Sequence, residues 1–167
     1  DMDAVYKAVF GGEKDMVRCG GKKDDTSGRG LVHIYCGDGK GKTTTSVGLS
    51  VRAAGSGKKV LFYQFLKNND SSERNILEKI PGITPVHGRD LQKFTFQMNE
   101  EELEELRKYN NEMLDKLFDM AKDYDMLVMD ESVYAIGSAL LDEKKLISHL
   151  EEKPFTLEVV LTGRNPS

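Results

Sequence analysis

The chain has 167 residues, of which 38% are hydrophobic, and its 24 basic and 28 acidic side chains give a formal net charge of −4. This size suits one globular domain with a single core, and the weak negative charge argues against duplex nucleic acid as a partner. The sequence contains neither a run of about 18 apolar residues for a membrane span nor a secretory signal pattern, so we expect a cytoplasmic protein that binds no membrane.

The first 29 residues differ from the rest in composition. Residues 3–10 (DAVYKAVF) have the spacing of a two-turn helix, whereas residues 11–30 are rich in glycine and charge. We expect a flexible N-terminal arm over residues 1–29 and a folded domain over residues 30–167. A disordered or vector-derived leader is the alternative interpretation of the arm.

A strand, a glycine-rich loop and a helix follow in that order. Residues 31–35 (LVHIY) predict the strand, and residues 44–55 predict a helix that ends at Gly55 or Gly57. Between them, GDGKGKT provides the last three residues of a Walker A motif, although Cys36 occupies the position of its first glycine. This context favours a phosphate-binding loop over a chance glycine-rich turn.

The loop contains the residue types that a triphosphate requires. Its glycines let backbone N–H groups turn toward phosphate oxygens, and the following helix contributes its positive end. We expect Lys42 to contact phosphate, Lys40 to add a second cation, and the Thr43 hydroxyl to coordinate Mg²⁺. The sequence therefore predicts nucleotide binding.

Strand and helix patterns alternate along the remaining chain. Apolar runs without a polar face predict buried parallel strands at residues 59–66, 125–131 and 156–164. Helical spacing or cap signals predict helices over residues 71–80, from Asn99 onward and after Asp142. This alternation predicts an α/β fold with a mostly parallel sheet flanked by helices. The sequence stops just after a strand, so we expect the domain to be incomplete at its C-terminus.

Two carboxylates end the second of these strands. Asp130 and Glu131 follow the apolar run MLVM, as in a Walker B strand, and a hard Mg²⁺ ion prefers such oxygen ligands. The alternative is an ordinary acidic strand end that meets solvent. The sequence leaves open which of the two carboxylates binds the ion directly.

Three arginines are candidates for further anion contacts, namely Arg52, Arg74 and Arg164. Arg164 stands out because it follows a predicted strand, and ligands of open parallel sheets lie beyond the carboxyl ends of the strands. By the same rule, the strand ends at Cys36, residues 64–67, Glu131 and Arg164 are expected to face one crevice.

Blocks spread over most of residues 30–165 resemble the P-loop family of cob(I)alamin (corrinoid) adenosyltransferases. The blocks are residues 37–67, SERNILE at 72–78, FTF at 94–96, VMDE at 128–131 and TGR at 162–164. The family loop has the form GNGKGKT, so Asp38 replaces the usual asparagine. The resemblance implies a P-loop NTPase-like, RecA-like fold and explains the absent first glycine.

The resemblance also implies an unusual reaction, in which Co(I) of a corrinoid attacks C5′ of ATP and intact triphosphate leaves. ATP is thought to lie reversed along the loop relative to ordinary NTPases. The residues implied for ATP are Gly37, Asp38, Gly39, Lys40, Gly41, Lys42, Thr43, Thr44, Arg52 and Arg164. Those implied for Mg²⁺ are Thr43, Asp130 and Glu131, and those implied for catalysis are Lys42, Thr43 and Glu131.

For the corrinoid, the resemblance implies that Phe94 and Phe96 lie near the lower face of the ring and exclude the axial ligand. Without the resemblance, an alternating core strand is the favoured interpretation of KFTF. The family further implies a homodimer, a short N-terminal helix that closes over the partner's site, and an electron-donating flavoprotein reductase. Two alternatives remain: a P-loop NTPase or kinase that cleaves the β–γ bond, and a nucleotide-binding regulator without turnover.

Overall fold

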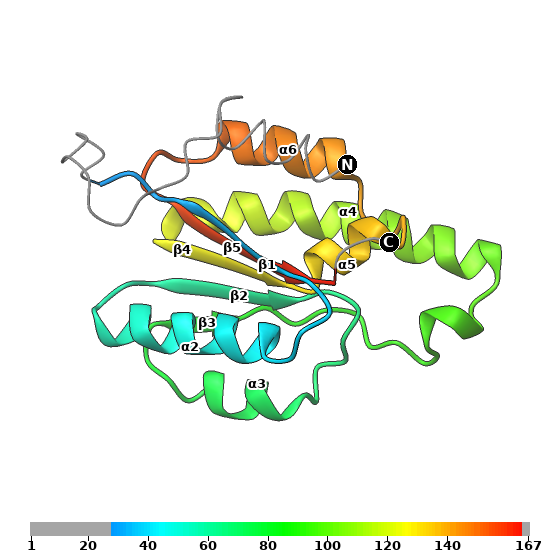
Figure 1. Ribbon diagram of the computed structural model, residues 1–167, viewed down its shortest axis with the longest axis horizontal. Helices are drawn as coiled ribbons and strands as arrows, with labels where there is room; N and C mark the ends of the chain where they lie inside the picture. Colours follow the sequence, from blue (N-terminus) through cyan, green and yellow to red (C-terminus); the bar gives the residue numbers. More distant parts are fainter. Residues whose placement is uncertain (1–27, 165–167) are drawn as a thin grey trace.

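Five parallel strands form one sheet in a computed structural model that describes residues 28–164 (Figure 1). The strand order is β1-β5-β4-β2-β3, so β5 separates the strand before the glycine loop from the strand that carries Asp130. The strands are β1 (Val32–Cys36), β2 (Val60–Gln64), β3 (Ile83–Pro85), β4 (Met126–Asp130) and β5 (Glu158–Gly163). The predicted helix at residues 3–10 lies outside the described residues.

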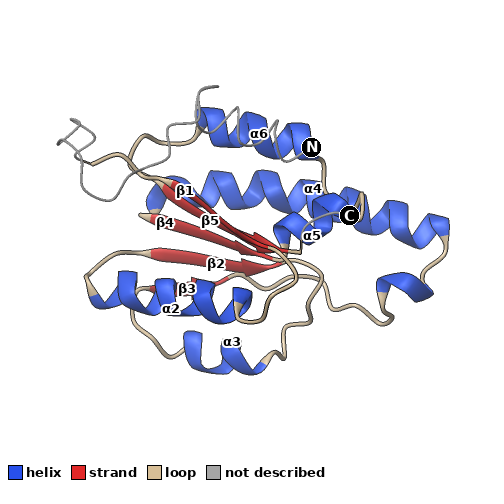
Figure 2. Cartoon of the chain, in the orientation of Figure 1, coloured by secondary structure: helices blue, strands red, loops and turns tan. Residues whose placement is uncertain are grey.

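Helices cover both faces of this sheet (Figure 2). One face carries α2 (Lys42–Gly55) and α3 (Ser72–Leu77). The other carries α4 (Glu100–Met120), α5 (Ser132–Gly137) and α6 (Glu143–Glu152). The predicted α/β class with a parallel sheet between helices is therefore confirmed. None of the helices in the described part of the chain is long and apolar enough to cross a membrane.

The apolar runs form the middle of the sheet. All five residues of β2 and all five of β4 are buried, because α2 and α3 cover one side of them and α4 and α5 the other. Burial on both sides explains why these strands lack the alternation typical of a sheet with one wet face. Because the middle of the sheet is fully buried, the carboxyl ends of β2, β4 and β5 are held in fixed positions, and the polar residues of these strands lie there.

Three local features differ from the expectations. β3, with three residues, and α5, with six, have no counterpart among the predicted elements. The interpretation of KFTF as a core strand is wrong: Thr95–Gln97 form a 3₁₀ turn, and both phenylalanine rings are exposed. The sequence alternation there belongs to a surface loop.

The start of α4 is fixed by a capping box. The Asn99 side chain accepts a hydrogen bond from the Glu102 N–H at 2.9 Å, and Glu102 Oε2 accepts one from the Asn99 N–H at 3.0 Å. We expect Asn99→Ala to lower the free energy of unfolding by about 1 kcal/mol in urea titrations, since one helix N–H loses its partner. Asn99→Asp keeps the acceptor and should lower the free energy of unfolding by only a few tenths of a kcal/mol. An alanine variant as stable as the wild type would contradict the assignment.

Candidate functional site

The glycine loop joins β1 to α2 at the carboxyl edge of the sheet. Gly37 and Gly41 have φ of +117° and +97°, a left-handed conformation that glycine adopts without the cost a side chain would add. Gly41 precedes the first residue of α2, and no side chain caps this helix, so its first N–H groups are available to an anion. Lys42 Nζ donates to Gly37 O at 2.6 Å and to Gly39 O at 2.7 Å, which holds the ammonium against the loop.

Asp130 is a buried acceptor at the centre of the site. Its side chain is fully buried, and β2, β5 and α2 all supply donors to it. The donors are Thr162 Oγ1 at 2.6 Å, Thr43 Oγ1 at 3.0 Å, Gln64 Nε2 at 3.1 Å, Lys67 Nζ at 3.4 Å and Ser46 Oγ at 3.5 Å. Asp130 therefore orients the Thr43 hydroxyl, and its own oxygens already have several partners.

Glu131 is the carboxylate that lines a cavity. It adopts a left-handed conformation with φ of +59° between β4 and α5, and its N–H donates to Thr162 Oγ1 at 3.0 Å. The cavity, about 310 Å³, is also lined by Leu66, Lys67, Tyr134 and Arg164. Burial and the neighbouring Asp130 raise the pKa of Glu131, whereas nearby cations oppose this shift. A cation bound in this cavity would favour the ionised form of Glu131.

Lys67 lies between two acidic groups at the end of β2. Its Nζ is 3.0 Å from Glu73 Oε1 and 3.4 Å from Asp130 Oδ2. Burial acts to lower the pKa of Lys67, but Asp130 and Glu73 outweigh it and raise the pKa. Burial likewise acts to raise the pKa of Glu73, yet hydrogen bonds from Gln64 Nε2, its own backbone and Lys67 lower it to about 2. Both groups are therefore charged at neutral pH.

A larger groove, with a volume of about 710 Å³, adjoins this cavity. Leu66, Lys67 and Tyr134 line both spaces. The groove is also lined by Phe94 and Phe96, whose rings are 70% and 82% exposed and stack at 5.4 Å with an interplanar angle of 8°. Exposed parallel rings of this kind provide an apolar surface for a flat ligand.

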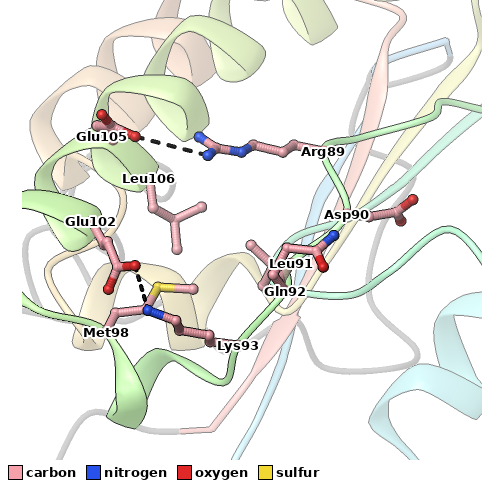
Figure 3. A pocket seen from close by; sticks show the side chains of 9 residues that line it. All are labelled: Arg89, Asp90, Leu91, Gln92, Lys93, Met98, Glu102, Glu105 and Leu106. Atoms are coloured by element: carbon pink, nitrogen blue, oxygen red, sulfur yellow. Dashed lines mark hydrogen bonds and ion pairs between the residues drawn. The ribbon is translucent and has the colours of Figure 1, made fainter.

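The segment that carries these rings is tied to α4 (Figure 3). Lys93 Nζ lies 2.6 Å from Glu102 Oε1, and Arg89 Nη2 lies 3.8 Å from Glu105 Oε2. Leu106 lies between the two pairs, and Met98 lies beside the Lys93–Glu102 pair (Figure 3). These residues line a small cavity of about 300 Å³ that shares Leu91, Gln92 and Lys93 with the groove. Because these two ion pairs join the segment to α4, we interpret this cavity as part of the support for the aromatic segment.

Most of the site residues predicted from the sequence lie together at the carboxyl edge, but Arg52 does not. It belongs to the last turn of α2, ten residues or about 15 Å from Lys42. Arg74 is buried and donates from Nη1 to Val86 O at 2.9 Å, so its guanidinium does not face the loop. Arg164 is exposed and lines the cavity beside Glu131. Asp38, Lys40 and Thr44 are exposed at the loop.

Sequence reasoning placed the end of β2 at the crevice but missed the roles of its residues. Gln64, Lys67 and Glu73 form one polar chain that ends on Asp130. The signal available in the sequence was a glutamine and a lysine at the end of an otherwise apolar strand, since a buried strand seldom ends in such residues without a polar partner.

A family model and two curated relatives all match this chain to the same protein family. The sequence model described as "ATP:corrinoid adenosyltransferase BtuR/CobO/CobP" matches residues 28–167. The chain is 34% identical over 143 residues to the corrinoid adenosyltransferase of Escherichia coli (strain K12), covering 81% of this chain and 68% of that protein. It is 33% identical over 147 residues to corrinoid adenosyltransferase CobA of Salmonella typhimurium (strain LT2), with the same coverage.

Among solved structures, the chain is similar to a KaiC-like protein from Pyrococcus horikoshii OT3. The TM-score is 0.46 and the sequence identity 20%, with 83% of this chain and 64% of that chain covered.

Proposed function

Because the chain belongs to the ATP:corrinoid adenosyltransferase family, we propose that it transfers the 5′-deoxyadenosyl group of ATP to Co(I) of a corrinoid and releases triphosphate. The observation that best supports this reaction is that the cavity beside Glu131 adjoins the aromatic groove. The cavity beside the phosphate loop and the aromatic groove share Leu66, Lys67 and Tyr134. Two substrates bound there would meet at this boundary.

In the proposed complex, the loop and the start of α2 hold the triphosphate. The backbone N–H groups of residues 37–44 and the Lys42 ammonium provide the positive potential, and Arg164 adds a cation at the cavity. Because the whole triphosphate is the leaving group, these groups neutralise charge that grows during the reaction. No nucleophile from the protein is needed, since the reduced cobalt is the nucleophile.

The residues beside the loop fit a Mg²⁺ ion chemically. Hard oxygen donors are present in the Thr43 hydroxyl and the Glu131 carboxylate, and Mg²⁺ typically takes one or two protein carboxylates together with phosphate oxygens. We propose that Thr43 and Glu131 hold the ion while Asp130, which accepts from Thr43 Oγ1, orients that hydroxyl from behind. When bound, Mg²⁺ would neutralise part of the triphosphate charge.

We propose that the corrin ring contacts the stacked Phe94 and Phe96 rings. Phe94→Ala and Phe96→Ala should each lower activity about tenfold more when Co(II) must be reduced in the site than when Co(I) is supplied, because the rings exclude the axial ligand that stabilises Co(II). Rates would be measured with and without prior chemical reduction of the corrinoid. Phe155 is an exposed phenylalanine outside the groove, and the matched control Phe155→Ala should change neither rate. Equal losses in both assays for Phe94→Ala and Phe96→Ala would contradict a role in excluding the axial ligand.

Three further properties complete the proposal. We propose a homodimer and a flavoprotein reductase as the electron donor, which rest on the resemblance of the sequence blocks to the family. We also propose a cytoplasmic location, which rests on the sequence pattern described above. Analytical ultracentrifugation of the full chain tests the dimer. A reduced flavoprotein reductase, supplied in place of a chemical reductant, tests the electron donor.

One assay tests the reaction itself. The protein is incubated with Mg-ATP and chemically reduced cobalamin, and both the corrinoid and the phosphate products are identified. The proposal predicts a light-sensitive alkyl-corrinoid and inorganic triphosphate in equal amounts. ADP and phosphate without an alkyl-corrinoid would instead assign the protein to the ordinary P-loop NTPases.

A further inference from the structure

We propose that Lys67 is a catalytic residue that stabilises the negative charge on the oxygen leaving C5′ of ATP, an inference that rests on the proposed function. Three residues, Leu66, Lys67 and Tyr134, line both the cavity beside Glu131 and the aromatic groove, and Lys67 is the cation among them. Its side chain is 32% exposed, so the ammonium can meet a ligand while remaining partly shielded from water.

The reaction requires a cation at this boundary. The electron pair of Co(I) forms the cobalt–carbon bond, and the electron pair of the C5′–O bond leaves with the triphosphate oxygen. Cobalt becomes formally Co(III), C5′ is reduced, and no proton is transferred. Because the triphosphate extends from the loop and the corrinoid lies in the groove, the bond that breaks falls where the two spaces join. A positive group at this boundary stabilises the transition state more than the ground state, because negative charge grows on the leaving oxygen during the reaction.

The structure holds Lys67 at this place through a chain of hydrogen bonds. Ser71 Oγ donates to Gln64 Oε1 at 2.8 Å, Gln64 Nε2 donates to Glu73 Oε1 at 2.6 Å, and Lys67 Nζ donates to the same Glu73 oxygen at 3.0 Å. Leu66, the preceding residue, has φ of +56°, an unfavourable conformation for leucine that turns the chain at the end of β2. Strain and a prearranged partner are both expected of a residue positioned for function.

The other cations near the site are placed for different tasks. Lys42 is bonded to two loop carbonyl oxygens and lies at the phosphate end. Arg164 lines the smaller cavity and does not line the aromatic groove. If Lys67 served only as a structural ion pair with Glu73 and Asp130, its replacement would reduce stability without a specific effect on the chemical step.

The first test separates binding from chemistry. Lys67→Gln should lower kcat about 100-fold with Co(I) supplied, while the KM for ATP changes less than threefold, because one donor to a developing anion contributes on the order of 10² in kcat. Lys67→Arg should recover most of the rate. Lys122→Gln, an exposed lysine on the turn after α4, is the matched control and should retain the wild-type rate. An unchanged kcat, or a loss confined to KM, overturns the proposal.

The second test changes the leaving atom. In an ATP analogue with sulfur bridging C5′ and the α-phosphorus, the leaving thiolate needs less stabilisation. The loss caused by Lys67→Gln should therefore shrink to less than about tenfold. An equal loss with both substrates indicates a structural role and overturns the proposal. Lys67→Met, which also removes the charge, gives the same comparison if the glutamine variant fails to fold. If wild-type protein forms no alkyl-corrinoid, the proposed function fails; a failure of Lys67 alone leaves it intact.

Discussion

Lys42→Ala is expected to lower the turnover number for alkyl-corrinoid formation on the order of 10³-fold with Mg-ATP and Co(I) supplied. The Lys42 ammonium lies against the loop carbonyls of Gly37 and Gly39, at the point where the triphosphate would bind. The leaving group carries its charge into the transition state, so loss of this cation weakens transition-state binding more than it weakens ATP binding. The measurement is steady-state formation of the alkyl-corrinoid under saturating substrates.

A matched lysine at the other edge of the sheet controls for a general change in charge. Lys58 is exposed and lies 3.8 Å from Asp125, at the amino end of β4, and Lys58→Ala should retain the wild-type rate. Thermal unfolding of both variants separates loss of the fold from loss of the cation. Unchanged kinetics for Lys42→Ala would show that ATP binds away from the loop.

The elements that could be predicted from the sequence are those whose structure depends on a pattern within a few consecutive residues. β2 and β4 were found because both sides of each strand are buried, so each is a continuous apolar run. α4 was found because Asn99 and Glu102 form a capping box. The loop at Gly37 to Lys42 was found because phosphate binding needs glycine and lysine at fixed spacing. In each case a few neighbouring residues are sufficient to determine the structure.

The polar chain behind the loop could not be predicted, because it depends on the register between strands. Gln64 is paired with Asp130 across β2 and β4, which are 66 positions apart in the sequence. Glu73 reaches the same place from α3, and Lys67 depends on the backbone turn at Leu66. The position of Arg52, by contrast, follows from the sequence, since the predicted helix over residues 44–55 already places it in the last turn, away from the loop.

Glu131→Gln and Asp130→Asn are expected to have different consequences, which assigns the two carboxylates. Glu131→Gln should lower turnover about 100-fold and raise the Mg²⁺ concentration needed for half-maximal ATP binding about tenfold, since Glu131 lines the cavity. Asp130→Asn should impair turnover as well, but it should also lower the free energy of unfolding by about 1–3 kcal/mol. Its new NH₂ group would replace one carboxylate oxygen, so either the Thr162 donor or the Thr43 and Gln64 donors would lose their acceptor.

At pH 7 the two variants should change stability in opposite directions. Burial and Asp130 raise the pKa of Glu131 above its ordinary value of 4.5, so the folded state binds more protons than the unfolded state between that value and the raised pKa. Stability of the metal-free protein therefore falls as pH rises through this window. Glu131→Gln removes the penalty and should be more stable than wild type at pH 7 but equal to it below pH about 4. If thermal unfolding instead showed Glu131→Gln destabilised at pH 7 and Asp130→Asn unaffected, the two roles would be exchanged.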